Sequence, residues 1–241
     1  MINTNSNLHH HNADKAALEK FGSIAADWWD PKGPMKALHQ INPLRLSYLE
    51  RHISLSGQKI LDLGCGAGLL SESLAQKSAE VTAIDLSSEV LEIAKAHAIE
   101  SQLEINYQLI AAESLAESHP HSFDVISCME LLEHVPDPSA IIQSCKTLLK
   151  PNGLVFFSTL NRTLKSYAFS IILAEYVLNY LPKGTHQYSQ FIRPSELTHW
   201  AEDAGLELID IQGIGYDPLH SEFKFSPKVD VNYCLCFRLP E

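Results

Sequence analysis

Cations are scarce in this sequence, and its cysteines form no disulfide framework. The 18 lysine and arginine residues face 29 aspartate and glutamate residues, which gives a formal net charge of −11 with the histidines neutral. Because such a charge repels polyanions, we expect no nucleic-acid partner. The five cysteines are odd in number and include no C-x-x-C pair, which favours a reducing compartment without disulfides.

A targeting segment is also missing from the beginning of the sequence. The first twenty residues contain no arginine and no apolar stretch, so we expect neither a secretory signal nor a transit peptide, and a cytoplasmic protein. His9 to His11 are interpreted as part of a flexible tail over residues 1–13 rather than as a metal site. The composition, 45% apolar and 20% charged, predicts one soluble folded domain over residues 1–241.

Two helices are expected to form an N-terminal helical cap over residues 14–56. Apolar residues recur at helical spacing from Asp14 to Trp29, where "WWDPKGP" ends the pattern. A second helix is expected to begin near Asn42, a good N-cap residue followed by Pro43, and to end near Ile53.

From "KILDLG" onward, apolar runs alternate with helical patterns. This alternation predicts an α/β fold, Rossmann-like and doubly wound, with a mostly parallel sheet. The expected strands lie near 59–63, 80–85, 105–110, 123–129 and 153–159. The expected helices lie near 68–77, 87–101, 138–149 and 194–204. The last two strands, "LELIDIQGI" and "VNYCLCFRL", are close enough in sequence to pair antiparallel.

A glycine loop follows the first of these strands. "LDLGCGAG" places Gly64, Gly66 and Gly68 at the carboxyl end of a parallel strand, where open α/β sheets bind their ligands. Glycine lets the backbone approach a ligand closely and offer its N–H groups. The next strand, "VTAID", ends in Asp85, a carboxylate suited to a ribose diol. The two features together predict a nucleoside-binding site.

These residues resemble the class I S-adenosylmethionine-dependent methyltransferases. The resemblance implies a seven-stranded sheet with an antiparallel last strand. Many members of that class carry an aspartate after the third strand that contacts the adenine, whereas this chain reads "LIAAES". Because Ala111 and Ala112 lack a carboxylate, adenine recognition falls to Glu113 or to the backbone.

The segment "CMELLEHVPDP" ends the fourth strand and carries a compact acidic turn. We expect Met129 to lie against the cofactor. Glu130, Glu133 and His134 have the spacing of one tight turn, which Pro136 prevents from continuing as a helix. The three side chains could hold a divalent ion, or His134 could act as a general base oriented by a glutamate. A solvated loop without chemistry is the third interpretation.

Residues 160–190 interrupt the alternation of strands and helices. The stretch Tyr167 to Leu181 is mostly apolar but too short to span a bilayer, so it suits a lid or an interfacial helix. Arg162, Lys165 and Lys183 surround it, which makes anionic membrane lipids plausible neighbours. The alternative is a helical hairpin packed on the domain.

Five segments together resemble the ubiquinone biosynthesis O-methyltransferase family. They read "WWDPKGPMKALHQINPLRLSYL", "LDLGCGAG", "MELLEHVPDP", "FFSTLNRTLKS" and "AEYVLNYLPKGTHQYSQFIRPSEL". The resemblance implies methyl transfer from S-adenosylmethionine to a polyprenylated catechol or 3-demethylubiquinol. It also implies a cytoplasmic enzyme associated peripherally with the inner membrane, in contact with other ubiquinone-pathway enzymes.

The same resemblance assigns roles to individual residues. The implied cofactor contacts are Arg45, Gly64, Gly66, Asp85 and Met129, with Arg45 clamping the methionine carboxylate. The implied Mg²⁺ ligands, which also activate the substrate hydroxyl, are Glu130, Glu133 and His134. Trp28, His39 and His186 lie in segments typical of the family and are candidates for the substrate mouth.

Two other functions remain open at this point. One is an O-methyltransferase for another small phenolic substrate. The other is a non-catalytic lipid-binding assembly component that keeps the cofactor fold for structure alone. A dependence of the rate on the prenyl tail would distinguish the family's activity from the first alternative. Binding of the cofactor would distinguish it from the second.

Overall fold

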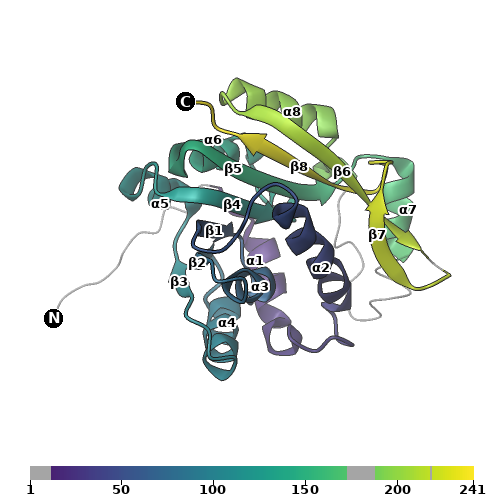
Figure 1. Ribbon diagram of the computed structural model, residues 1–241. Helices are drawn as coiled ribbons and strands as arrows, with labels where there is room; N and C mark the ends of the chain where they lie inside the picture. Colours follow the sequence, from purple (N-terminus) through teal and green to yellow (C-terminus); the bar gives the residue numbers. More distant parts are fainter. Residues whose placement is uncertain (1–11, 173–187, 218) are drawn as a thin grey trace.

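The computed structural model describes residues 12–172, 188–217 and 219–241 (Figure 1). One eight-stranded sheet has the order β3-β2-β1-β4-β5-β8-β6-β7. Its strands are β1 (Lys59–Leu63), β2 (Glu80–Asp85), β3 (Asn106–Leu109), β4 (Phe123–Met129), β5 (Leu149–Leu160), β6 (Glu207–Asp217), β7 (Glu222–Ser226) and β8 (Asn232–Arg238). Strands β1 to β5 are parallel, whereas β8 is antiparallel to both β5 and β6.

Helices cover both faces of this sheet (Figure 1). They are α1 (Lys15–Ser23), α2 (Lys36–Glu50), α3 (Leu69–Ala75), α4 (Ser88–Glu100), α5 (Ala112–Ser118), α6 (Pro138–Leu148), α7 (Leu164–Ile172) and α8 (Pro194–Asp203). Two apolar clusters fill the layers. Helices α5, α6 and α8 contribute to one cluster, and α2, α3 and α4 contribute to the other. Apolar residues on both faces explain why the parallel strands read as continuous apolar runs.

The predicted α/β fold is confirmed, with one strand more than the seven implied by the family resemblance. The additional strand is β7, which pairs antiparallel with the second half of β6 from Gly213 to Asp217. Its five residues, "EFKFS", are too short and too exposed to stand out from a loop in the sequence. Helix α5 was also missed. Strand β5 begins at Leu149, earlier than expected, because it already pairs with Phe123 there.

The second helix does not begin near Asn42 as expected. Helix α2 (Lys36–Glu50) continues through Pro43, and the Asn42 side chain donates a hydrogen bond to Ser73 Oγ at 2.8 Å instead of capping a helix. An interior proline removes one backbone hydrogen bond and usually costs about 3 kcal/mol. Burial of this helix offsets that cost, because Tyr48 is completely buried against the sheet.

The first helix is shorter than the expected span of Asp14 to Trp29. Asp14 caps α1, but the helix ends at Ser23 and a 3₁₀ turn follows at Ala25–Asp27. This break matters for the two tryptophans. Neighbouring residues of a continuous helix point in different directions, whereas Trp28 and Trp29 both contact the glycine loop.

The insertion is described only at its two ends. Helix α7 (Leu164–Ile172) begins it, and the predicted apolar stretch Tyr167 to Leu181 extends beyond the described residues. Lys183 and His186 lie outside them entirely. Among the residues that the structure describes, no helix combines the length and hydropathy needed to cross a membrane.

Candidate active site

The carboxyl ends of β1, β2 and β4 open onto a cavity of about 310 Å³. The predicted site residues that line it are Arg45, Gly64, Gly66, Asp85, Met129, Glu130, Glu133 and His134. Sheet topology explains the convergence, because parallel neighbouring strands end at the same edge. The cavity therefore joins the glycine loop to the acidic turn, two segments that the sequence separates by more than sixty residues.

Asp85 holds the glycine loop in shape. Its two carboxylate oxygens accept hydrogen bonds from the backbone N–H groups of Gly66 and Ser87, both at 2.9 Å. Burial raises the pKa of Asp85, although these N–H groups and that of Leu86 oppose the shift. Under the loop, buried Asp62 accepts bonds from the hydroxyls of two serines. Asp85 thus fixes the loop and still borders the cavity.

The N-terminal cap closes one wall of this cavity. Gly66 has φ +54°, and a Cβ built on it would lie 2.4 Å from Cζ2 of Trp28. The indole N–H of Trp29 donates to the carbonyl oxygen of Ala67 at 3.0 Å, and its ring stacks on His97 at 3.4 Å. The bond from Trp29 to Ala67 joins residues that are 38 positions apart, so it holds the N-terminal cap against the glycine loop.

The three residues suspected at the substrate mouth have different positions. Trp28 lines the cavity, as expected of a wall residue. His39 lies behind it, with Nε2 at 2.9 Å from the Trp28 carbonyl oxygen, so it supports that wall. His186 lies outside the described residues.

The segment after β3, where adenine recognition was expected, places Glu113 at the cavity. Ala111 precedes α5 as its N-cap residue, and Ala112 is buried, so neither supplies a polar contact. Glu113 lines the cavity and accepts a hydrogen bond from the Asn12 side chain at 3.1 Å. The carboxylate of Glu113 thus borders the cavity, and recognition of adenine by Glu113 or by the backbone stays a prediction.

Glu130 is held by residues from three other elements. Its Oε1 lies 3.2 Å from a terminal nitrogen of Arg45 and accepts bonds from Ser158 Oγ at 2.7 Å and Asn232 Nδ2 at 3.0 Å. Burial by itself raises the pKa of Glu130, but the Arg45 charge and the bonds from Asn232, Ser158 and Glu133 outweigh it and lower the pKa. These contacts favour the negatively charged form of Glu130.

Glu133 has the opposite protonation tendency. It is 3% exposed and accepts a hydrogen bond from Thr159 Oγ1 at 2.8 Å. Burial, followed by the charge of Glu130, raises the pKa of Glu133 well above its usual value. The two side chains interact, and the opposite directions of their pKa shifts favour the proton on Glu133 rather than on Glu130.

The predicted convergence of three ligands is found only for the two glutamates. His134 ends a 3₁₀ turn, Leu132–His134, and its ring meets the edge of Phe21 at 5.3 Å between ring centres. Within the described ranges, the residues whose potential ligand atoms all lie within 4.8 Å of one another are Asp217, His220 and Glu222, outside the cavity lining. This conformation does not bring all three predicted ligands to one ion.

Ser158, Thr159 and Asn232 were missed as site residues. Ser158 and Thr159 follow the apolar run "LVFF" of β5, and Asn232 precedes the mostly apolar run "YCLCF" of β8. A buried polar residue near the end of an apolar strand was the one sequence signal for them. Their relevance depends on which strands are neighbours, and the sequence order alone does not give the position of β8 between β5 and β6.

A family model described as "Methyltransferase domain" matches residues 15–211. Among solved structures, magnesium protoporphyrin IX methyltransferase from Synechocystis PCC 6803 with bound SAH has a TM-score of 0.67 at 19% identity. The match covers 92% of this chain and 97% of that one, a likeness of fold. Together with the glycine loop and Asp85, these findings define a class I S-adenosylmethionine-dependent methyltransferase.

Curated relatives narrow this class further. The ubiquinone biosynthesis O-methyltransferase of Coxiella burnetii is 56% identical over 230 residues, which cover 95% of this chain and 98% of the relative. That of Paraburkholderia phymatum is 55% identical over 227 residues, with 94% and 98% covered. The chain belongs to the ubiquinone biosynthesis O-methyltransferase family, which confirms the resemblance found in the sequence motifs, and it is an S-adenosylmethionine-dependent O-methyltransferase.

Proposed function

We propose that the protein transfers the methyl group of S-adenosylmethionine to a hydroxyl of a polyprenylated catechol and of 3-demethylubiquinol. One observation carries this proposal: a single cavity joins the glycine loop to the acidic turn. The chain is also 56% identical to a ubiquinone biosynthesis O-methyltransferase. The residues proposed to bind the cofactor and those proposed to deprotonate the substrate thus line the same cavity.

Arg45 is proposed to bind the carboxylate of the methionine part of the cofactor. It is buried, lines the cavity and already pairs with Glu130 through a terminal nitrogen. Among the described residues, its Nε has no hydrogen-bond partner. A buried guanidinium N–H without a partner is costly, and a ligand carboxylate would satisfy it. Gly64, Gly66, Asp85 and Met129 complete the proposed cofactor contacts.

The reaction requires removal of a proton from the substrate hydroxyl. His134 lines the cavity, and an imidazole is the side chain most often used to accept a proton in catalysis, so His134 is the proposed general base. The lowered pKa of Glu130 keeps a negative charge in the cavity beside the proposed substrate hydroxyl, whereas the raised pKa of Glu133 makes it the less suitable base. The sulfonium already makes the methyl group reactive, so the residues contribute mainly position and exclusion of water.

Magnesium remains part of the proposal. Glu130 and Glu133 lie together, and the charge of one raises the pKa of the other. A divalent cation would relieve that repulsion, and oxygen ligands suit Mg²⁺. Glu130 and Glu133 would hold the ion, with His134 turning away from Phe21 to join them. Bound there, it would lower the pKa of the substrate hydroxyl.

We also propose that the enzyme works at the inner membrane, where a polyprenylated substrate partitions, beside other enzymes of the ubiquinone pathway. Two cations expected to contact anionic lipids are already paired. Arg162 lies 2.9 Å from Glu196, and Lys165 lies 2.7 Å from Asp230. Apolar contact is the better-supported mode, since Leu164 at the start of α7 is 79% exposed.

The prenyl tail is expected to increase the rate of methyl transfer. In detergent or vesicles, kcat/KM for a prenylated catechol should exceed that for the same catechol without the tail by about tenfold or more, because burial of each CH₂ contributes about 0.8 kcal/mol. Calorimetric titration with S-adenosylhomocysteine serves as the control for cofactor binding. Equal rates on both catechols would favour another phenolic substrate, and no cofactor binding would favour a non-catalytic role.

A chelator is expected to slow this reaction. Excess EDTA should reduce the rate on the prenylated catechol, and added Mg²⁺ should restore it, because a cation between Glu130 and Glu133 would acidify the hydroxyl. S-adenosylhomocysteine binding, measured in the same buffers, should not change. Full activity in EDTA would instead assign deprotonation to His134 without a metal.

A further inference from the structure

Both ends of the insertion attach beside one residue, Asn232, the first residue of β8. At the entry, the backbone N–H of Asn161 donates to Val231 O at 2.8 Å. At the exit, the Tyr233 hydroxyl donates to Ile192 O at 2.9 Å. Val231 and Tyr233 are the two chain neighbours of Asn232, so the described ends of the insertion fasten on either side of it.

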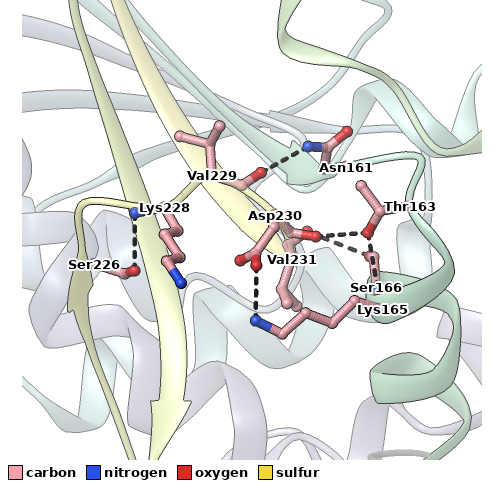
Figure 2. Close-up of polar contacts among 9 residues, drawn as sticks. All are labelled: Asn161, Thr163, Lys165, Ser166, Ser226, Lys228, Val229, Asp230 and Val231. Atoms are coloured by element: carbon pink, nitrogen blue, oxygen red, sulfur yellow. Dashed lines mark hydrogen bonds and ion pairs between the residues drawn. The ribbon is translucent and has the colours of Figure 1, made fainter.

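The entry attachment is a dense set of polar contacts (Figure 2). Thr163 Oγ1 donates to Asp230 O at 2.6 Å, and Ser166 Oγ donates to Val231 O at 3.3 Å. Lys165 pairs with the Asp230 carboxylate at 2.7 Å. These contacts fix the first turn of α7 to the loop between β7 and β8, so a shift of one moves the other.

Asn232 continues this connection into the cavity. It is 7% exposed, lines the cavity, and donates through Nδ2 to Glu130 Oε1 at 3.0 Å. Among the described residues its amide oxygen is buried without a hydrogen-bond partner. An unsatisfied buried carbonyl costs about 1–3 kcal/mol, so an apolar side chain would be more stable there. The cost is explained if the amide is needed to hold Glu130.

We propose that Asn232 is a positioning residue that couples the attachment of the insertion to the carboxylate of Glu130. The proposal rests on the proposed function, in which Glu130 stabilises charge next to the substrate hydroxyl. When the first turn of α7 moves, its hydrogen bonds pull the backbone of Asp230 and Val231 with it. The amide of the adjacent Asn232 then shifts, and its hydrogen bond to Glu130 weakens. The catalytic rate then depends on the position of the first turn of α7.

A double-mutant cycle between Thr163 and Asn232 tests this coupling. Asn232→Leu removes the amide and keeps the number and branching of the side-chain heavy atoms, and should lower kcat on the prenylated catechol about tenfold with little change in S-adenosylhomocysteine affinity. Thr163→Val removes the bond to Asp230 O and the bond that Thr163 Oγ1 accepts from the Ser166 N–H, both of which attach the first turn of α7, and should lower kcat about threefold. In the Asn232→Leu background, Thr163→Val should have no further effect.

Thr147→Val is the matched control, because Thr147 also donates its hydroxyl to a backbone carbonyl, that of Gln143, away from the cavity. It should leave kcat unchanged in both backgrounds. Circular dichroism and thermal unfolding confirm that each variant is folded. If Thr163→Val lowers kcat equally with and without the Asn232 amide, the coupling is refuted while the methyltransferase function stands. A wild-type protein inactive on the catechol would refute the proposed function itself.

Discussion

Gly66→Ala is expected to weaken S-adenosylhomocysteine binding about a hundredfold or more, a loss that corresponds to about 2.7 kcal/mol. The new Cβ would lie 2.4 Å from the Trp28 ring, far inside contact distance. Since Trp28 is buried and forms a cavity wall, it cannot yield without moving the N-terminal cap. The positive φ at this position adds a further strain of about 1–2 kcal/mol. Isothermal titration calorimetry measures the affinity.

Gly57→Ala is the control that separates strain from contact. Gly57 also has positive φ, at +75°, but a Cβ there meets nothing within 4 Å. This variant should lose about 1 kcal/mol of unfolding free energy and keep its cofactor affinity. If Gly66→Ala and Gly57→Ala bind S-adenosylhomocysteine with similar affinity, the contact between the loop and Trp28 does not explain the need for glycine at position 66.

Local patterns were sufficient to predict the glycine loop, because its chemistry is contained in eight consecutive residues and one strand end. Strand β1 (Lys59–Leu63) leads into the loop as predicted, whereas the bond between Gly66 and Asp85 was not predicted. The contact of Trp28 with Gly66 could not be predicted in the same way. It depends on where helix α1 ends, and the helical spacing of apolar residues continued past that point.

For the acidic turn too, local sequence predicts the position but not the tertiary contacts. Its position at the cavity followed from the end of β4, but the protonation states of its glutamates did not follow from local sequence. Glu130 is charged because Arg45, Ser158 and Asn232 surround it, and Asn232 is 102 residues away in the chain. Glu133 is buried beside Thr159, and this burial was not visible in a turn that read as polar. Tertiary neighbours decide such questions.

Arg45→Met is expected to lower the unfolding free energy by about 3 kcal/mol at neutral pH, because removing one partner of a buried ion pair leaves the other charge unpaired. The pair joins Arg45 and Glu130 at 3.2 Å, with side chains 7% and 19% exposed. Cofactor affinity should also fall, since the proposed partner of the methionine carboxylate is lost. Urea denaturation monitored by circular dichroism measures the stability.

The pH dependence of this loss has a definite sign. In the wild type, the pKa of Glu130 is lowered, so its pairing stabilises the fold above the usual carboxylate pKa and is lost as the pH falls. In Arg45→Met, burial is no longer opposed by the guanidinium, so the pKa of Glu130 rises and the folded state favours protonation. The stability difference between the two proteins should therefore shrink as the pH is lowered from 7 toward 4.

A second substitution decides whether the unpaired charge is the cause. Adding Glu130→Gln to Arg45→Met removes the charge while keeping the shape, so the double variant should recover more than about 1 kcal/mol of the loss at neutral pH. Lys77→Met is the control, because it breaks the exposed pair of Lys77 with Glu50, at 2.7 Å, and should cost less than about 1 kcal/mol. Without recovery in the double variant, lost packing of the Arg45 side chain would explain the effect, and Glu130 would not be the charged group of the site.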